Sequence, residues 1–370
     1  MPGCCARWWR EYPLRPCGLL LLWQDSHPIS LGNKTRHASD GTSVSHCAPR
    51  RVTCFWGIVF CLFPIMGDSM KFTKPATSVN DQITLLRHRG MVINDEARAR
   101  HYLQHISYYR LRAYWLPFEV PAGDGDHAFR AGTNFEDVLS LYVFDRQLRL
   151  LIMDAIDRVE VALRANWAHY MAMTYGSHGY LEQNLYARRD RHAKGITTLT
   201  TDFKHSKDTF AEHYRRKYTN PNLPPVWMAA EIISFGQLSM WFDNLKLRKD
   251  RKAIAKPFAL DERVLGSFVH HISNVRNICA HHGRLWNKRF TVTMAVPKYP
   301  AKLPVAMCGV NGRQLHNTLV MLDYLLSIIA PDTEWRARLV ALIDGCPLAD
   351  PTSMGFPEDW LARAAWRVVG

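Results

Sequence analysis

The apolar positions of this chain recur at helical spacing from about residue 70 onward. One stripe is longer than the others, and its members are Leu148, Ile152, Ile156, Val159, Leu163 and Tyr170. Steps of three and four residues are the period of an amphipathic helix. The pattern predicts a helix that begins near Asn134 and ends at Gly176, either continuous or divided in two near Asp145.

Shorter helical patterns flank this stripe. Ser78 with Asp81 resembles a capping box, and Gly90 is a natural helix end. The further predicted helices span about 78–90, 95–107, 226–247 with an interruption at Gly236, 262–282 with a stop at Gly283, 313–329 and 333–344. Residues 183–222 are polar and basic and are predicted to form a less regular connector. No sustained strand alternation is present, so we expect one all-α domain, with or without a smaller helical element at residues 70–120.

The first 69 residues differ from the rest of the chain. They hold six of the nine cysteines and two apolar bursts without a helical or strand period. The second burst, Val52–Met66, is about 15 residues long and contains Pro64, whereas a membrane span needs about 20. We interpret residues 1–69 as a non-native upstream extension or a disordered segment before a start at Met66 or Met70, and residues 70–370 as the helical domain. A weak membrane tether and a Cys-rich accessory segment are the alternatives.

The charge balance indicates a polyanionic partner. The chain has 47 Lys and Arg against 33 Asp and Glu, a formal net charge of +14. Such an excess of positive charge favours nucleic acid as the first choice of partner and an anionic membrane as the second. No Cys-x2-Cys pair is present, and His101 with His105 lacks a third ligand, so we expect no metal and no cofactor. The three cysteines beyond residue 69 are far apart in the sequence, which favours a reducing compartment. We therefore expect a cytoplasmic protein with no stable membrane association.

The end of the predicted helix at 262–282 carries candidate chemistry. Successive helical residues lie about 100° apart, so Asn277 and His281 share a face and Arg276 lies beside Asn277. His281 can transfer a proton near neutral pH, and Arg276 can hold a phosphate and stabilise its developing charge. Asn277 can orient His281 or a ribose. The trio suits RNA cleavage by transesterification, although an Arg and a His at this spacing also occur by chance at helix ends that only cap and pack.

Cleavage of RNA needs both a general base and a general acid. A helix C-terminus favours the protonated imidazolium, which suits the acid role. One histidine cannot readily serve both roles, so we predict a homodimer in which two copies of His281 meet across a two-fold axis. His282 is the alternative second group within one chain.

The same residues resemble a known family. Arg276-Asn277 and His281, followed by His282, Arg284-Leu285-Trp286-Asn287, resemble the signature of the Abi (abortive infection, AbiD/AbiF-like) proteins of the HEPN superfamily. Further runs that resemble the family's pattern are Lys74-Pro75, Gln82, Arg89-Gly90, Tyr108-Tyr109-Arg110-Leu111, Phe144-Asp145-Arg146 with Leu148-Arg149, Glu160-Val161 with Arg164, Trp227 with Glu231, Ser234-Phe235-Gly236, and Met354-Gly355-Phe356-Pro357 with Trp360. The resemblance covers roughly residues 70–365.

The resemblance implies a HEPN-like helical bundle with extra N- and C-terminal helices. It also implies a metal-independent endoribonuclease of the Arg-x4-His type, with Arg276, Asn277 and His281 at its site. The expected role is bacterial phage defence, and the expected RNA is host, phage or small non-coding RNA. The candidates for RNA contacts are His282, Arg284, Arg158, Arg164, Arg110 and Arg112.

Two other classes of function compete with the nuclease. The basic face could bind a structured or regulatory RNA without cutting it, and the aromatic-basic run Tyr108–Trp115 could stack unpaired bases, although aromatic residues at this spacing also build helical cores. The chain could instead be a helical scaffold or a membrane-tethered sensor, for which residues 1–69 would matter.

Overall fold

The computed structural model describes residues 74–121, 127–307 and 312–367. Every helix described below lies within Thr77–Gly370, the second of the two units into which the chain divides. The interpretation of residues 1–69 falls outside the described residues.

The expected all-α fold is confirmed for the part of the chain that the structure describes. Strand pairing there is limited to isolated β-bridges such as that of Val92 with Asn134. The α-helices are α1 (Val79–His88), α2 (Glu96–Ile106), α3 (Tyr108–Trp115), α4 (Phe135–Tyr175), α5 (Arg189–His205), α6 (Thr209–Lys217), α7 (Val226–Ile232), α8 (Phe235–Asn244), α9 (Arg248–Ala255), α10 (Glu262–Ala280), α11 (Lys302–Met307), α12 (Leu315–Ile329) and α13 (Trp335–Asp344). None of the described helices combines the length and the apolar character that crossing a bilayer requires.

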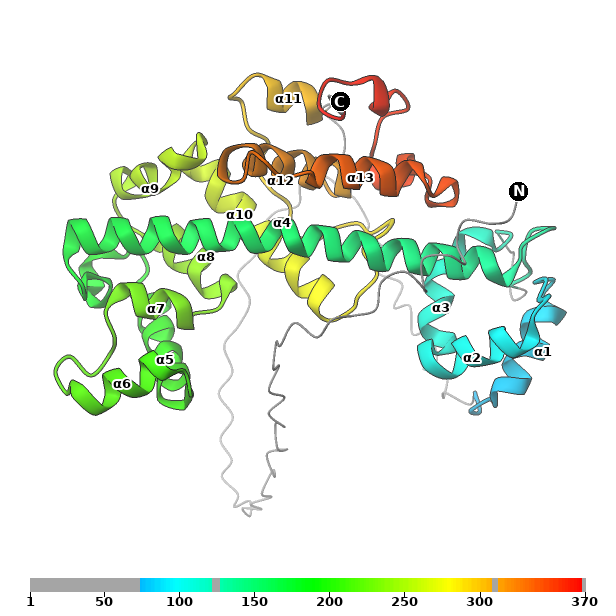
Figure 1. Cartoon of the computed structure of the whole chain (residues 1–370), viewed down its shortest axis with the longest axis horizontal. Coiled ribbons are helices and arrows are strands. Elements are labelled where there is room, and N and C mark those ends of the chain that lie inside the picture. Colours follow the sequence, from blue (N-terminus) through cyan, green and yellow to red (C-terminus); the bar gives the residue numbers. More distant parts are fainter. Residues whose placement is uncertain (1–73, 122–126, 308–311, 368–370) are drawn as a thin grey trace, which may run out of the picture. The chain divides into compact units, whose positions relative to one another are not determined.

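Helix α4 is the element against which most others pack. Its 41 residues extend over roughly 60 Å at 1.5 Å per residue. The side chain of Asn134 accepts from the backbone N–H of Asp137 at the start, and Gly176, with a φ of +80°, ends the helix. Helices α3, α7, α9, α10, α12 and α13 all contact it, with α12 and α13 along one side and α7 along another (Figure 1). The helix is continuous through Asp145, because Phe144 and Leu148 continue the buried stripe across that point.

Local sequence signals place most of the other helices where they were expected. Ser78 and Asp81 form the predicted capping box of α1. Helices α2, α10, α12 and α13 match their predicted spans within two residues. The segment 226–247 divides into α7 and α8 as expected, but at Ile233 instead of Gly236, because Ser234 and Gln237 form a capping box that starts α8.

The prediction of an irregular connector at 183–222 is wrong. That stretch forms α5 and α6, and the short helices α9 and α11 were not predicted either. The buried face of α5 consists of His192, Gly195, Leu199 and Phe203. Only two of these four buried positions, Leu199 and Phe203, carry an apolar side chain. A side chain at Gly195 would collide with the indole of Trp241, which packs directly against the α5 backbone. The helix was missed because a glycine and a histidine occupy core positions.

A buried carboxylate joins α3, α4 and the loop that follows α10. Asp145 is fully buried in α4. Its Oδ1 accepts from the backbone N–H groups of Leu285 and Trp286 at 3.0 and 2.6 Å, and its Oδ2 accepts from the Tyr114 hydroxyl at 2.6 Å and pairs with Arg149. Burial, followed by the charge of Asp145, raises the pKa of Tyr114 above its ordinary value, so the phenol remains a donor. All lone-pair directions of the carboxylate are therefore used to hold the loop in place.

A buried histidine holds the segment beyond that loop alongside α10. His271 contacts the carbonyl of Val292 through Nδ1 at 2.7 Å and the hydroxyl of Thr318 through Nε2 at 2.8 Å. Burial lowers the pKa of His271, so the neutral ring donates to the carbonyl and accepts from Thr318. The backbone N–H of Phe290 also donates to the carbonyl of Arg313 at 2.8 Å. These bonds hold residues 290–292 alongside α10.

The C-terminal segment docks on α12 through an aromatic cluster around His316. The rings of Phe356, Trp360 and Trp366 pack against one another, and Trp366 Nε1 donates to His316 Nε2 at 3.3 Å. Burial, with a smaller contribution from the charge of Arg363, lowers the pKa of His316 to about 4. The neutral form is therefore the one that the folded chain accommodates.

Replacement of Asp145 with Asn is expected to lower the free energy of unfolding by about 3–5 kcal/mol, because it leaves the buried Arg149 guanidinium without its counter-charge. A urea titration followed by tryptophan fluorescence measures this loss. Asp157, an exposed carboxylate on the same helix, supplies the control. Asp157→Asn should change stability by no more than about 0.5 kcal/mol. Equal stability of the two variants would contradict the assigned role of Asp145.

Acidification is expected to destabilise the fold through His316. The unfolded chain takes up a proton near the ordinary pKa of 6.5, whereas folded His316 stays neutral down to about 4. The unfolded state therefore binds more protons in this window, and stability falls as the pH drops through it, by about 3 kcal/mol in total. His316→Gln keeps an acceptor for Trp366 but does not titrate. Urea unfolding at several pH values should show a shallower pH dependence for this variant; parallel curves would rule out the assignment.

Candidate functional site

The C-terminal end of α10 places the predicted trio at the surface. Arg276, Asn277 and His281 are all exposed, and His281 is the residue that caps the helix. The helix ends in a Schellman motif, in which the N–H of His282 donates to Cys279 at 3.0 Å and the N–H of Gly283 donates to Ile278 at 2.8 Å.

The residue at the left-handed position of this motif is not glycine. His282 has a φ of +56°, and the predicted stop, Gly283, is the residue that follows it. A side chain in this conformation costs about 1 kcal/mol relative to glycine. The chain thus keeps an exposed imidazole beside His281 at a position where glycine would be more stable.

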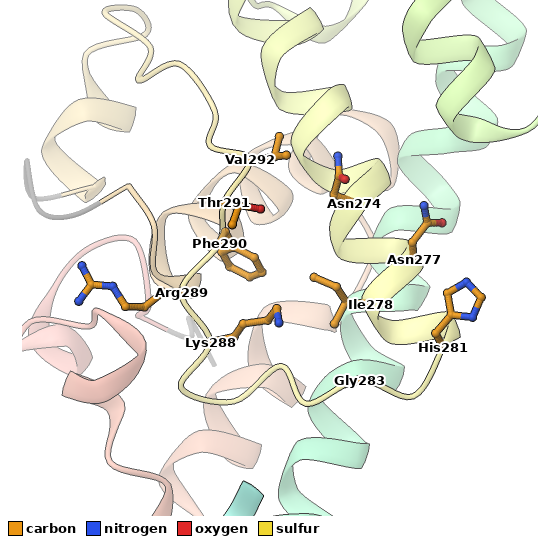
Figure 2. Close-up of a pocket in the computed structure, with 10 residues that line it drawn as sticks. All are labelled: Asn274, Asn277, Ile278, His281, Gly283, Lys288, Arg289, Phe290, Thr291 and Val292. Carbon is orange, nitrogen blue, oxygen red and sulfur yellow. The ribbon is translucent and has the colours of Figure 1, made fainter. Parts of the chain in front are cut away.

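Asn277 and His281 line an open pocket of about 490 Å³, which we call the α10 pocket. Asn274 lies one turn earlier on the same face, and Ile278 supplies an apolar surface between these polar groups (Figure 2). The positions are spaced by three, four and seven residues, so they form a single stripe on the helix.

The opposite wall of the α10 pocket comes from residues 288–292 (Figure 2). Lys288, Arg289 and Thr291 contribute polar side chains, and Phe290 and Val292 contribute apolar ones. This wall is held in place by the bonds of His271 and Phe290 described above.

The electrostatic character of the site is positive. No acidic side chain is among the described residues that line the α10 pocket. Lys288, Arg289 and Arg276 form no ion pair with another described residue, so their charges are not neutralised locally. An anion such as a phosphodiester is the ligand that this arrangement favours.

Arg276 lies outside the lining of the α10 pocket. It is about 100° around the helix from Asn277, on the side away from His281. The structure therefore brings two of the three predicted residues into one pocket and leaves the third on the adjoining surface of the same helix end.

Cys279 is part of the core and not of the reactive surface. Its side chain is buried, and burial raises the pKa of its thiol to about 12. Because the thiolate is the nucleophilic form, this cysteine is not a candidate for covalent chemistry.

Two of the arginines proposed for RNA contacts help to hold the loop after α10. Arg110 donates to the carbonyl of His282 at 2.5 Å, and the half-buried Arg284 donates to the carbonyl of Ala113 at 2.6 Å. Both bonds connect α3 to the loop. These guanidinium groups are engaged with backbone acceptors beside the site, so their first role is to fix the position of the two histidines.

The other proposed arginines lie on different parts of the surface. Arg164 pairs with Glu160 and donates to the carbonyls of Ala230 and of Ile233, the latter at 2.7 Å, so it closes the end of α7. Arg158 pairs with Asp154 at 3.3 Å on the exposed side of α4. Arg112 lies 3.5 Å from His127. None of these three lines the α10 pocket.

The aromatic-basic run at 108–115 is mostly core. Leu111, Tyr114 and Trp115 are buried, whereas Tyr109 is 85 % exposed. Stacking of an RNA base is therefore open to Tyr109 but not to the buried rings. His101 and His105 lie against each other with ring centroids 4.5 Å apart, and no group of three or more metal-ligating side chains occurs among the described residues.

Four polar residues of the α10 pocket were not identified from the sequence: Asn274, Lys288, Arg289 and Thr291. Asn274 could have been found, because it lies on the same helical face as Asn277 and His281. The other three could not, because they reach the pocket through the tertiary bond between His271 and Val292.

Comparison with known proteins identifies one family. No curated protein and no solved structure matches the chain. The model of the Abi-like protein family matches residues 101–287, half of the chain, a stretch that runs from α2 through α4 to the loop after α10. The match includes Asn277, His281 and the anchoring Asp145 with its two backbone donors. The chain therefore belongs to the Abi-like protein family.

Proposed function

We propose that this protein is a bacterial phage-defence endoribonuclease that cuts RNA without a metal ion, and that Arg276, Asn277 and His281 form its site. The observation that carries the proposal is the exposed face of the α10 end, where Asn277 and His281 line a pocket without acidic groups and Arg276, Lys288 and Arg289 carry unpaired positive charge. Membership in the Abi-like family supports the abortive-infection role. Assignment to the HEPN superfamily, with an AbiD/AbiF-like subtype, is part of the same proposal.

The proposed reaction is transesterification within the RNA. A base removes the proton of a ribose 2′-hydroxyl, and the oxygen forms a bond to the adjacent phosphorus. The bond from phosphorus to the 5′-oxygen of the next nucleotide breaks, and an acid delivers a proton to that oxygen. The products are a 2′,3′-cyclic phosphate and a 5′-hydroxyl, with no oxidant or water consumed.

Each residue has a role that its position supports. His281, in the lining of the α10 pocket, transfers a proton. Lys288, in the same pocket, stabilises the charge that develops on the non-bridging oxygens, and Arg276, on the adjoining face, does so for a phosphate held by the partner copy. Asn277, in the pocket with His281, orients the ribose or the imidazole.

The second proton transfer is assigned to a second copy of the chain. Two exposed helix ends that meet across a two-fold axis would bring two His281 side chains and two Arg276 side chains to one phosphate. The location of Arg276 outside its own pocket supports this arrangement, because an arginine on the adjoining face can reach a phosphate held by the partner. We further propose that the protein acts on RNA as a homodimer, and that it does so in the cytoplasm, where host and phage transcripts are found.

A non-catalytic RNA-binding module is the second candidate. The unpaired cations and the open pocket support this candidate as strongly as they support the nuclease, because they bind phosphate whether or not a proton is transferred. Loss of cleavage upon removal of His281, with binding retained, separates the two.

His281→Ala in the full chain is expected to lower RNA cleavage by at least about 100-fold, because general acid–base catalysis contributes 10²–10⁴-fold. Cleavage of a labelled single-stranded RNA in excess EDTA measures the effect, and the ends of the products identify the reaction. The wild type should leave 2′,3′-cyclic phosphates, and the variant should bind RNA as tightly as the wild type.

His169, an exposed histidine on α4, provides the matched control, and His169→Ala should cleave normally. Cleavage that stops in EDTA, or that persists in His281→Ala, would contradict the proposed chemistry. Tight, salt-sensitive binding without cleavage by any variant would favour the RNA-binding module.

The source of the second proton can be tested by mixing. Wild-type and His281→Ala chains are exchanged at constant total concentration. If one cleavage centre needs His281 from both copies, an equal mixture retains about one quarter of the wild-type activity, because only wild-type pairs are active. Independent sites would retain about one half.

His282→Gly tests the alternative within one chain. Glycine relieves the positive φ and should raise the free energy of unfolding by about 1 kcal/mol. Under the two-copy arrangement it leaves cleavage intact. If cleavage is lost in a stabilised protein, the second proton belongs to His282 and the two-copy assignment is wrong.

A further inference from the structure

The polar face of α10 extends well beyond the α10 pocket. Asn274, Asn277 and His281 line the pocket, and the exposed His270 and Arg263 continue the same face toward the start of the helix. Steps of three, four and seven residues keep all five on one stripe, which we call the α10 stripe. It follows the helix for about 27 Å at 1.5 Å per residue. A single phosphate covers only a small part of this length.

No acidic side chain interrupts the part of the sequence that forms the α10 stripe. Between Glu262 and Asp323 the chain has eight Lys and Arg residues and no Asp or Glu. This part includes α10 beyond its first residue and the second wall of the α10 pocket. Glu262, the first residue of α10, is buried. A polyanion that follows the α10 stripe therefore meets no exposed negative charge on α10 itself.

A row of lysines lies on α9, beside the start of the α10 stripe. Lys249, Lys252 and Lys256 are exposed, and Lys256 keeps the helical backbone angles, so spacings of three and four residues place them on one side of the helix. We call these three lysines the α9 ridge. None of them forms an ion pair with a described residue. Arg248 on the same helix pairs with Glu262, so the ridge adjoins the start of α10 (Figure 1).

The acidic residues next to the α9 ridge in the sequence are already engaged within the fold. Asp250 is fully buried, and the hydroxyls of Tyr170 and Tyr175 each donate to it at 2.8 Å. The other two acidic residues of the segment 246–263 both pair with Arg248. The lysines of the ridge therefore present positive charge to the solvent that no carboxylate of their own segment neutralises.

We propose that the α9 ridge binds the phosphate backbone of the RNA whose cleaved phosphate lies in the α10 pocket, and that the strand follows the α10 stripe between the two. The path to the pocket rests on the proposed function, whereas the binding of RNA by the ridge does not. Lysines contact phosphates without reading base edges, so the ridge increases the affinity for RNA of any sequence. At the 3.4 Å spacing of a stacked strand, a path of about 27 Å needs about eight nucleotides.

An anionic membrane is the other polyanion that a row of lysines can bind. A helix that lies in a membrane surface also needs an apolar face that inserts among the lipids. Ile254 and Ala255 of α9 are buried in the core, and the exposed side of the helix carries lysines. The α9 ridge therefore has the charge that binds RNA but lacks the apolar surface that a membrane helix requires.

Removal of the three lysines is expected to reduce the salt dependence of RNA binding. Lys249→Gln, Lys252→Gln and Lys256→Gln are combined in the full-length chain, in a His281→Ala background that leaves the RNA intact. The ligand is a labelled single-stranded RNA of about 16 nucleotides, twice the length of the path. Fluorescence anisotropy gives the association constant at several KCl concentrations. The slope of its logarithm against the logarithm of the salt concentration should decrease in magnitude by about 2, because each phosphate contact on a single strand contributes about 0.7.

Three lysines on another part of the surface supply the matched control. Lys194 and Lys204 on α5 and Lys207 just after it are exposed, and their combined replacement with Gln removes the same charge from the chain. This variant, in the same background, should keep the slope of the parent chain. Thermal melting checks that all variants are folded.

Two kinds of result would overturn the inference. An equal loss of slope in both triple variants would mean that only net charge matters, and an unchanged slope in the α9 variant, or no RNA binding at all, would mean that the ridge does not contact RNA. If the α9 variant instead loses binding to phosphatidylserine vesicles and keeps its RNA binding, the ridge is a membrane site. Titration far above the Kd should give no more than one strand per chain; two strands per chain would mean that ridge and pocket bind separate RNAs.

These outcomes are separate from the outcome of the cleavage assay. The expected loss of slope, together with a wild type that never cleaves RNA, would leave the α9 ridge in place and remove the nuclease proposal. Cleavage by the wild type with an unchanged slope in the α9 variant would do the reverse.

Discussion

The buried carboxylate of Asp145 is the interaction on which the geometry of the site depends. It accepts from two consecutive backbone N–H groups of the loop after α10, from Tyr114 on α3 and from Arg149 on its own helix. The loop cannot shift along α4 without leaving these donors unsatisfied in a dry interior, which is costly. Since His281 and His282 directly precede the residues that Asp145 holds, this buried carboxylate helps to set their positions.

This arrangement divides the basic residues into two groups. Arg110, Arg149 and Arg284 use their guanidinium groups on backbone acceptors or on Asp145, and so build the support of the site. Arg276 and Lys288 have no counter-charge among the described residues and remain available to an anion. The large net positive charge indicated a polyanionic partner but did not show which basic side chains would contact it. The hydrogen bonds of each side chain show which ones are already engaged within the fold and which ones are available.

The extent to which the sequence could predict the structure follows from the range of the interactions involved. Helix starts at Ser78 and Asn134 were predictable, because capping depends on residues three positions apart. The Asn277–His281 face was predictable from helical periodicity alone. Helix α5 was missed because Gly195 occupies a core position that only the packing of Trp241 explains. The second wall of the α10 pocket was likewise invisible, since His271 and Val292 are 21 residues apart and meet only in the folded chain.

The end of α10 carries a conformational cost that a simple helix cap avoids. A Schellman motif needs only glycine at its left-handed position, and the chain has a glycine one residue later, yet His282 occupies that position at a cost of about 1 kcal/mol. Arg110 then binds the His282 carbonyl and restrains the strained residue. A helix that merely had to end would not require this restraint. The restraint holds His282 in its left-handed conformation, and the buried Asp145 and Arg149 hold the loop that follows, so the end of α10 is a rigid surface.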